Sequence, residues 1–165
     1  MYTRILVPVD GSPTSARGLD EALRLAKLAG ASVRLVHVLD EPVFFGPEIY
    51  AADVFGLMQE AGAKLMEEMK ARAVAAGVEV STFVSKVLPG RVCDVVLEQA
   101  KDFDADLIVI GTHGRRGVGR LLVGSDAEQI VRLATVPVLL VRAPRNAGPS
   151  TSTSGSARKA AAVAA

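Results

Sequence analysis

The sequence predicts an α/β fold in which a parallel β-sheet lies between two layers of helices. Short apolar runs alternate along the chain with longer segments in which apolar residues recur at helical spacing. The runs are continuously apolar, as in strands that are buried on both faces of a sheet. Strands that alternate with helices form parallel sheets with right-handed crossovers. The third observation is a glycine-rich stretch after the fourth apolar run, where such folds hold ligands.

Composition indicates one soluble globular domain of ordinary charge. The chain has 165 residues, half of them hydrophobic, and no apolar run approaches the roughly 18 residues of a membrane-spanning helix. With 19 basic and 18 acidic residues, its net charge of +1 favours neither nucleic acid nor a membrane surface as partner. The single cysteine, Cys93, excludes an internal disulfide and lies in a helical apolar pattern, so we expect inert packing in a cytoplasmic protein.

The first strand and helix are defined by their boundaries. Residues 4–9 (RILVPV) form a β-rich apolar run, after which Ser12 is suited to capping a helix and Pro13 to its first turn. Helical spacing then continues to Gly30, a residue typical of a helix end. Residues 32–39 (SVRLVHVL) predict a second strand, in which we expect the histidine, His37, to be a core residue.

The middle of the chain predicts a loop, two helices and an edge strand. Residues 40–50 contain two prolines and a glycine, and they form an unusually long connection that suggests a flap or lid. A long helical pattern covers residues 54–76, and the alternation in residues 78–87 (VEVSTFVSKV) predicts a strand exposed on one face. The next helix has one apolar face, made by Val92, Val95, Val96 and Ala100.

Residues 106–125 (DLIVIGTHGRRGVGRLLVGS) have the pattern of a buried strand that leads through a glycine loop to a helix N-terminus. Glycines let backbone N–H groups approach an anion, and the positive end of a helix dipole favours negative charge. Ser125 and Glu128 fit a capping box at the start of that helix. Residues 136–142 (VPVLLVR) predict a fifth strand, which Pro137 places at an edge.

The spacing of the glycines excludes two common nucleotide motifs. The chain has no G-x-x-x-x-G-K-[ST] sequence, and the G-x-G-x-x-G pattern that begins at Gly117 fails because Leu122 occupies its last position. The pattern that is present is G-x2-G-x9-G-S, formed by Gly111, Gly114, Gly124 and Ser125.

This pattern resembles that of the universal stress protein family, in particular its ATP-binding branch. The resemblance covers residues 1–143 and includes a first strand that ends in VPVDGS, a second that ends in HV and a last strand VPVLLVR. It implies a three-layer sandwich with five parallel strands in the order 3-2-1-4-5, Rossmann-like and similar to the adenine nucleotide alpha hydrolases. Ligand is then expected at the carboxyl ends of the strands, where the order reverses. Residues 144–165, rich in Ser, Gly and Ala, are expected to be a flexible tail outside the domain.

The resemblance also implies roles for particular residues. Pro8 and Val9 would line an adenine pocket, Asp10 would face the ribose, and the backbone of Val38 would meet the adenine edge. Gly111 and Gly114 would approach the ribose and phosphates, and Gly124 and Ser125 would offer N–H groups and a hydroxyl to the phosphates. Two alternatives stay open for Arg115 and its neighbour Arg116: direct contact with the phosphates, or a place in a solvated loop. The expected ligand is ATP, with Mg²⁺ left open, and the expected assembly is a homodimer formed through the fifth strands.

One residue departs from the family pattern. Asp126 follows the motif serine, where the family usually has a small apolar or hydroxyl residue. It would repel phosphate, help to hold Mg²⁺, or favour the helix dipole from a solvent-facing position.

The main functional hypothesis is a nucleotide-responsive regulatory protein in stress tolerance, with protein partners that the sequence does not identify. The alternatives are a slow ATPase or phosphotransferase at the same pocket, and a nucleotide-free dimer that acts through protein contacts. No catalytic or metal-binding residue is assigned. His113 lies beside the proposed site but has no identifiable Ser, Cys or acidic partner.

Overall fold

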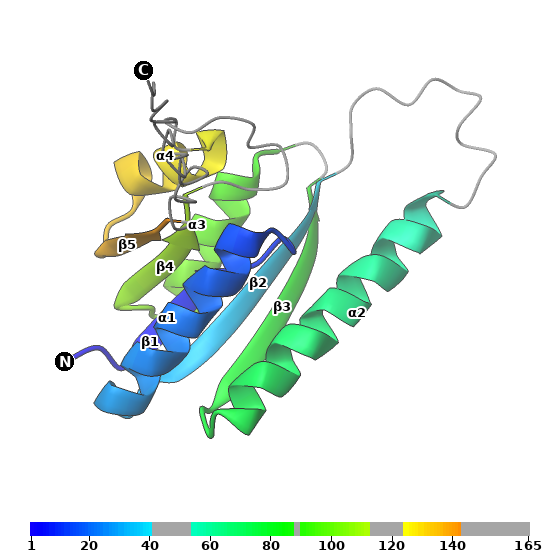
Figure 1. Ribbon diagram of the computed structural model, residues 1–165. Helices are drawn as coiled ribbons and strands as arrows, with labels where there is room; N and C mark the ends of the chain where they lie inside the picture. The colour runs from blue at the N-terminus through cyan, green and yellow to red at the C-terminus, as the bar shows by residue number, and fades with distance from the viewer. Residues whose placement is uncertain (41–53, 88–89, 113–123, 143–165) are drawn as a thin grey trace, which may run out of the picture.

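A computed structural model describes residues 1–40, 54–87, 90–112 and 124–142. They form a five-stranded parallel sheet in the order β3-β2-β1-β4-β5, which confirms the predicted fold class and strand order (Figure 1). The elements are β1 (Arg4–Pro8), α1 (Pro13–Ala29), β2 (Ser32–Asp40), α2 (Val54–Ala75), β3 (Val80–Val87), α3 (Val92–Asp102), β4 (Leu107–Gly111), α4 (Ser125–Leu133) and β5 (Val138–Val141). The expected flap, most of the glycine loop and the expected tail lie outside the described residues.

The most apolar strands occupy the centre of the sheet. Ile5, Leu6 and Val7 of β1 and all five residues of β4 are buried. β1 pairs with β2 on one side and with β4 on the other, in registers that include Ile5↔Val33 and Ile5↔Leu107. The strand order therefore reverses between β1 and β4.

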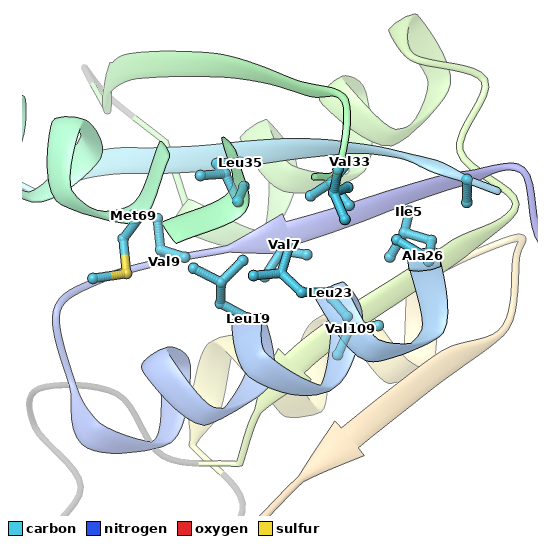
Figure 2. Packing of buried hydrophobic residues seen from close by; sticks show 14 of the residues in the cluster. Ile5, Val7, Val9, Leu19, Leu23, Ala26, Val33, Leu35, Met69 and Val109 are labelled. Carbon is cyan, nitrogen blue, oxygen red and sulfur yellow. The ribbon is translucent and has the colours of Figure 1, made fainter. Parts of the chain in front are cut away.

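Helices cover both faces of the sheet, as the alternation of strands and helices predicts. α1 and α2 pack on one face, where Leu19, Leu23 and Met69 meet side chains of the central strands (Figure 2). α3 and α4 cover the other face, where Val96 and Ile130 are fully buried. Cys93 belongs to this second cluster and is also fully buried, which confirms its packing role.

The ends of α1 match the sequence signals. Ser12 is the N-cap residue, and its Oγ accepts a hydrogen bond of 3.1 Å from the backbone N–H of Ser15. Pro13 occupies the first helical turn, and Gly30 ends the helix with a φ of 68°. The positive φ explains why a glycine stands there.

The two edge strands are β3 and β5, as predicted. Val84 on β3 is 46% exposed, whereas all four residues of β5 are half-buried. β5 is shorter than the predicted 136–142 because Pro137 has no N–H to donate to the ladder; its carbonyl still accepts from Ile108 at 3.0 Å. No described helix is long and apolar enough to span a membrane.

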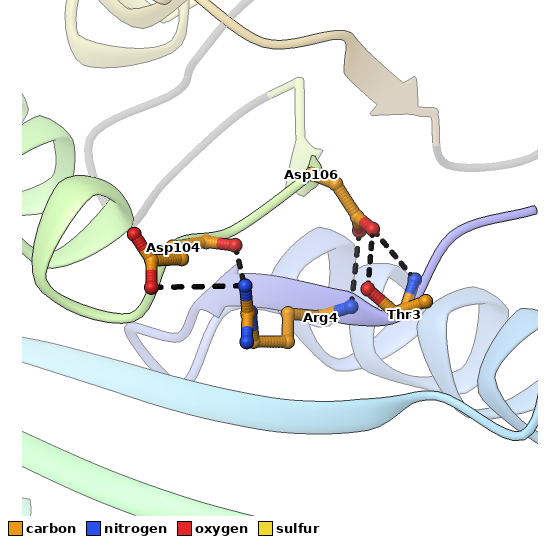
Figure 3. A network of polar contacts seen from close by, with 4 residues as sticks. All are labelled: Thr3, Arg4, Asp104 and Asp106. Atoms are coloured by element: carbon orange, nitrogen blue, oxygen red, sulfur yellow. Dashed lines mark hydrogen bonds and ion pairs between the residues drawn. The ribbon is translucent and has the colours of Figure 1, made fainter.

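A polar network joins the amino ends of β1 and β4 (Figure 3). Oδ2 of Asp106 accepts hydrogen bonds from the N–H and the hydroxyl of Thr3, both at 2.7 Å, and Oδ1 accepts from the N–H of Arg4 at 3.0 Å. The Nε of Arg4 donates to the carbonyl of Asp104 at 2.9 Å. Burial alone would raise the pKa of Asp106, but the hydrogen bonds from Thr3 and Arg4 outweigh it and lower the pKa.

The predicted capping box on α4 is wrong. The N-cap of α4 is Gly124, Ser125 is the first helical residue, and no side chain of the described residues makes a capping hydrogen bond there. The first helical bond runs from Glu128 N–H to the Gly124 carbonyl at 2.9 Å. Since the helix begins one residue earlier than the capping box requires, the Ser125 side chain cannot act as the cap.

Candidate functional site

The candidate site lies at the carboxyl edge of the sheet, where β1 and β4 diverge. Immediately beyond β1, the N–H of Val9 donates to the Val36 carbonyl of β2 at 2.8 Å. Immediately beyond β4, the N–H of Thr112 donates to the Val141 carbonyl of β5 at 2.9 Å. The segment that follows β1 is thus held toward β2, and the segment that follows β4 is held toward β5. This divergence is expected at a topological switch point.

The turn between β1 and α1 is organised by its own polar side chains. Oδ1 of Asp10 accepts a hydrogen bond of 2.9 Å from the N–H of Ser12. Ser12 in turn caps α1 and lies 3.2 Å, oxygen to oxygen, from the hydroxyl of Thr14. Ser12, Thr14 and Ser15 are all buried, so the N-terminus of α1 is closed by protein groups.

The N-terminus of α4 is built differently. Gly124 has no side chain to fold over the first turn, and the exposed Ser125 follows it. The N–H of Gly124 donates to the Thr112 carbonyl at 2.7 Å, which fixes the start of α4 to the end of β4. The first-turn N–H groups of a helix have no acceptor within the helix. Since no described side chain caps α4, its N-terminus is a better candidate for an anion site than that of α1.

Gly111 lies where the turn, β4 and α1 meet. A Cβ atom at this position would lie 2.7 Å from the carbonyl carbon of Thr14 and 2.9 Å from the nitrogen of Ser15. The α1 backbone fills this space, so the described neighbours give Gly111 a packing role. The predicted contact of Gly111 with ribose and phosphate remains a prediction.

The structure brings most of the predicted site residues to one edge of the sheet. Pro8, Val9 and Asp10 end β1 and begin the turn, and Asp10 N–H lies 3.4 Å from the hydroxyl of Ser15, next to Gly111. Val38 lies near the carboxyl end of β2, two residues beyond the Val36 carbonyl that binds Val9. Gly124 and Ser125 reach this edge through the bond to Thr112. Gly114 and Arg115 lie outside the described residues.

Asp126 lies in the first turn of α4 and is exposed, together with Glu128. The charge of Asp126 also affects Cys93, whose thiol pKa is raised. Burial is the largest cause, the charge of Asp94 follows, and Asp126 adds a smaller effect. Among the residues that the structure describes, no group of three His, Cys, Asp or Glu is placed to hold a metal ion.

Two residues of this region were missed by the sequence interpretation. Thr112 is 1% exposed, and its backbone joins β5 to the start of α4. Gly62 is buried within α2, where its missing side chain leaves room for His37 and Leu39. An isolated glycine inside a helical pattern was the available signal for Gly62, whereas a threonine after a buried strand carries no such signal.

A parallel sheet of this order, covered on both faces and with a switch point between β1 and β4, places the protein in the Rossmann-like class of α/β proteins. Residues 1–142 match the model of the universal stress protein family, and the chain belongs to that family. A universal stress protein of Methanocaldococcus jannaschii is 34% identical over 147 residues, which are 88% of this chain and 85% of that protein.

Solved structures of relatives share the fold. A universal stress protein from Burkholderia pseudomallei is 31% identical, with 86% of this chain and 97% of that chain covered and a TM-score of 0.67. A universal stress protein in complex with cAMP is 26% identical, with 85% of this chain and 97% of that chain covered and a TM-score of 0.63. The protein from Archaeoglobus fulgidus in complex with dAMP is 25% identical over 85% and 98%, with a TM-score of 0.60. Adenine nucleotides therefore bind to proteins of this fold and family.

Proposed function

We propose that this protein binds ATP at the carboxyl edge of β1 and β4 and acts as a nucleotide-responsive regulator. The observation that carries the proposal is the N-terminus of α4, which has no side-chain cap in the part of the chain that the structure describes and is fixed beside the end of β4. A helix end of this kind favours phosphate through its N–H groups and its dipole. The cAMP and dAMP complexes of related proteins support an adenine nucleotide as the ligand class.

The residues of the edge suggest how the nucleotide is held. The adenine is proposed to lie at Pro8, Val9 and the Val38 backbone, and the ribose at Asp10. The phosphates are proposed to approach Gly124 and Ser125, with contributions from Gly111, Gly114 and Arg115. Because the N–H of Gly124 already donates to Thr112 in this structure, we propose that the phosphates lie closest to the N–H and the hydroxyl of Ser125.

The charge of Asp126 bears on affinity. Its exposed position in the first turn of α4 favours the helix dipole, but the same position lies next to the proposed phosphate donors. Mg²⁺ bound with ATP would reduce the repulsion between the carboxylate and the phosphates. We therefore propose that ATP binds more tightly with Mg²⁺ than without it.

The regulatory part of the proposal concerns the surface of the cytoplasmic protein. Nucleotide occupancy changes the surface that partner proteins contact, and this requires a different affinity for nucleotide in two states of the protein. The assembly is proposed to be a homodimer formed through β5, whose outer edge has no neighbouring strand within the described sheet.

The test is calorimetric titration of nucleotide-stripped protein with ATP, with and without Mg²⁺. Gly124 has φ −59° and ψ 149°, a conformation open to any residue, so Gly124→Leu adds bulk without backbone strain. We expect the wild type to bind and Gly124→Leu to weaken binding by about tenfold or more, equivalent to about 1.4 kcal/mol. Arg132→Leu, at the exposed far end of α4, is the control and should bind like the wild type.

A second variant, Asp126→Val, separates the roles of the carboxylate. Tighter ATP binding in the absence of Mg²⁺ would identify Asp126 as a repelling charge, and weaker binding only in the presence of Mg²⁺ would identify it as a metal contact. If neither the wild type nor Asp126→Val binds ATP, the proposed function is wrong.

A further inference from the structure

His37 is a buried side chain that links three elements at the edge of the proposed site. It lies on β2, is 2% exposed, and its Nδ1 is 2.7 Å from the carbonyl oxygen of Val9. Val9 is the residue that follows β1 and precedes Asp10. The contact thus joins β2 to the turn between β1 and α1.

The chemistry of this contact assigns the proton. A carbonyl oxygen only accepts hydrogen bonds, so Nδ1 of His37 must carry the hydrogen and donate it to Val9. Val9 is 3% exposed, and without His37 its buried carbonyl would lose this partner. The N–H of Val9 donates to Val36 at 2.8 Å. Both backbone polar groups of Val9 are therefore held by β2, and this fixes the direction in which the chain enters Asp10.

α2 lies against the opposite side of the same ring. A Cβ atom on Gly62 would be 3.1 Å from both Cδ2 and Nε2 of His37, and 3.0 Å from a methyl group of Leu39. Glycine is less favourable than alanine inside a helix, so its presence there calls for a packing reason. The close approach to the His37 ring supplies a packing reason for this glycine.

We propose that His37 is a positioning residue for the nucleotide site, which sets the Val9 carbonyl, and hence Asp10, in the conformation that meets the ligand. Gly62 is the small residue that lets α2 hold the imidazole ring in this orientation. The inference rests on the proposed function, because it assigns His37 a part in the binding of the same nucleotide.

The test compares two replacements of His37. In His37→Asn, the side-chain amide nitrogen is separated from the backbone by the same number of bonds as Nδ1, so a donor to Val9 is kept. His37→Leu puts a branched apolar side chain in place of the imidazole ring and so removes the donor. ATP affinity is measured by calorimetry at a temperature where each variant is folded, and amide hydrogen exchange is followed at Asp10 and Gly11.

We expect His37→Leu to weaken ATP binding by about tenfold or more and to speed exchange in the turn, while His37→Asn retains most of the affinity. Val33→Ala is the matched control, since it removes buried atoms at the amino end of the same strand. This control should lower stability and leave ATP affinity unchanged, which separates a positioning role from general destabilisation.

Gly62→Ala keeps the donor and moves the ring, so it tests the inference even if His37→Leu does not fold. We expect Gly62→Ala to weaken ATP binding by a smaller factor than His37→Leu. Wild-type affinity in both folded Gly62→Ala and folded His37→Leu, or an equal loss in His37→Asn and His37→Leu, would refute the positioning role while leaving ATP binding intact. An absence of ATP binding in the wild type would instead refute the proposed function, and the role of His37 with it.

Discussion

Asp106 shows how one side chain fixes the relative position of two strands that are distant in sequence. Its carboxylate accepts three hydrogen bonds from Thr3 and Arg4, across more than 100 residues of chain. These bonds favour the charged form over the protonated form, and they lower the pKa of Asp106 despite the opposing effect of burial. The stability that they provide therefore depends on pH.

The sign of that dependence follows from the lowered pKa. The contribution of Asp106 is fully present above the unfolded value near 3.8 and is lost as the pH falls through the lower folded value. We expect Asp106→Asn to reduce the free energy of unfolding at pH 7 by an amount on the order of 1 kcal/mol, and to reduce it less at pH 3.

Urea unfolding of wild type and Asp106→Asn at the two pH values measures this difference. Glu98→Gln, which removes an exposed carboxylate on α3, is the control for the loss of one negative charge. A stability difference between wild type and Asp106→Asn that is the same at both pH values would contradict the assigned role of the carboxylate.

At the scale of elements, α1 and α4 begin in opposite ways at the same edge of the sheet. α1 is capped by the buried Ser12 and begins with proline, whereas Gly124 is the N-cap of α4 and no side chain within the described ranges caps that helix. A capped N-terminus gains stability from its own side chain, and an uncapped one keeps its first-turn N–H groups for other acceptors. The N-terminus of α1 therefore serves the stability of the fold, whereas that of α4 is the end at which we propose that phosphate binds.

The cap on α1 leads to a prediction about stability. We expect Ser12→Ala to lower the free energy of unfolding by about 1 kcal/mol, because the Ser15 N–H loses its acceptor in a buried turn. Chemical denaturation measures the change, with Thr135→Ala as a control that removes an exposed hydroxyl. A change in Ser12→Ala no larger than in the control would show that the cap contributes little.

At the scale of the whole molecule, β5 is the edge through which we propose that the protein dimerises. The carbonyl groups of Pro137 and Val141 point toward β4, where they accept from Ile108 and Thr112. Since backbone groups alternate in direction along a strand, those of Val138 and Leu140 point away from β4, toward the edge that has no neighbouring strand in the described sheet. This edge is a template for a second strand unless another chain covers it.

Two substitutions at one position test the proposed dimer. Leu140→Pro removes an outward N–H together with the leucine side chain, whereas Leu140→Ala removes only most of the side chain. We expect Leu140→Ala to remain dimeric and Leu140→Pro to sediment as a monomer at micromolar concentration, with circular dichroism as the check of folding. A wild-type protein that sediments as a monomer, or a dimeric Leu140→Pro variant, would contradict pairing through β5.

Much of the fold was predictable because its signals are local. The apolar runs, helical spacing, Ser12, Pro13 and Gly30 each describe a few neighbouring residues, and the observed elements follow them closely. The order of the strands came from the family resemblance, since hydrophobic periodicity does not say which strands are neighbours. The prediction of a capping box on α4 was wrong because the start of this helix is fixed by a contact that is distant in sequence. The N–H of Gly124 binds the Thr112 carbonyl, and Gly124, not Ser125, is the N-cap.

The sequence by itself determined the α/β class, the boundaries of most elements and the glycine spacing that points to a phosphate site. Only the tertiary structure decided that Gly111 is packed against the α1 backbone and that no described side chain caps α4. It also decided that the His37 ring lies between the Val9 carbonyl and Gly62. The physical reason is that these roles depend on contacts between segments that are far apart in the chain. Local patterns set which conformations a segment favours, but close approach and hydrogen-bond partners exist only once the segments have packed together.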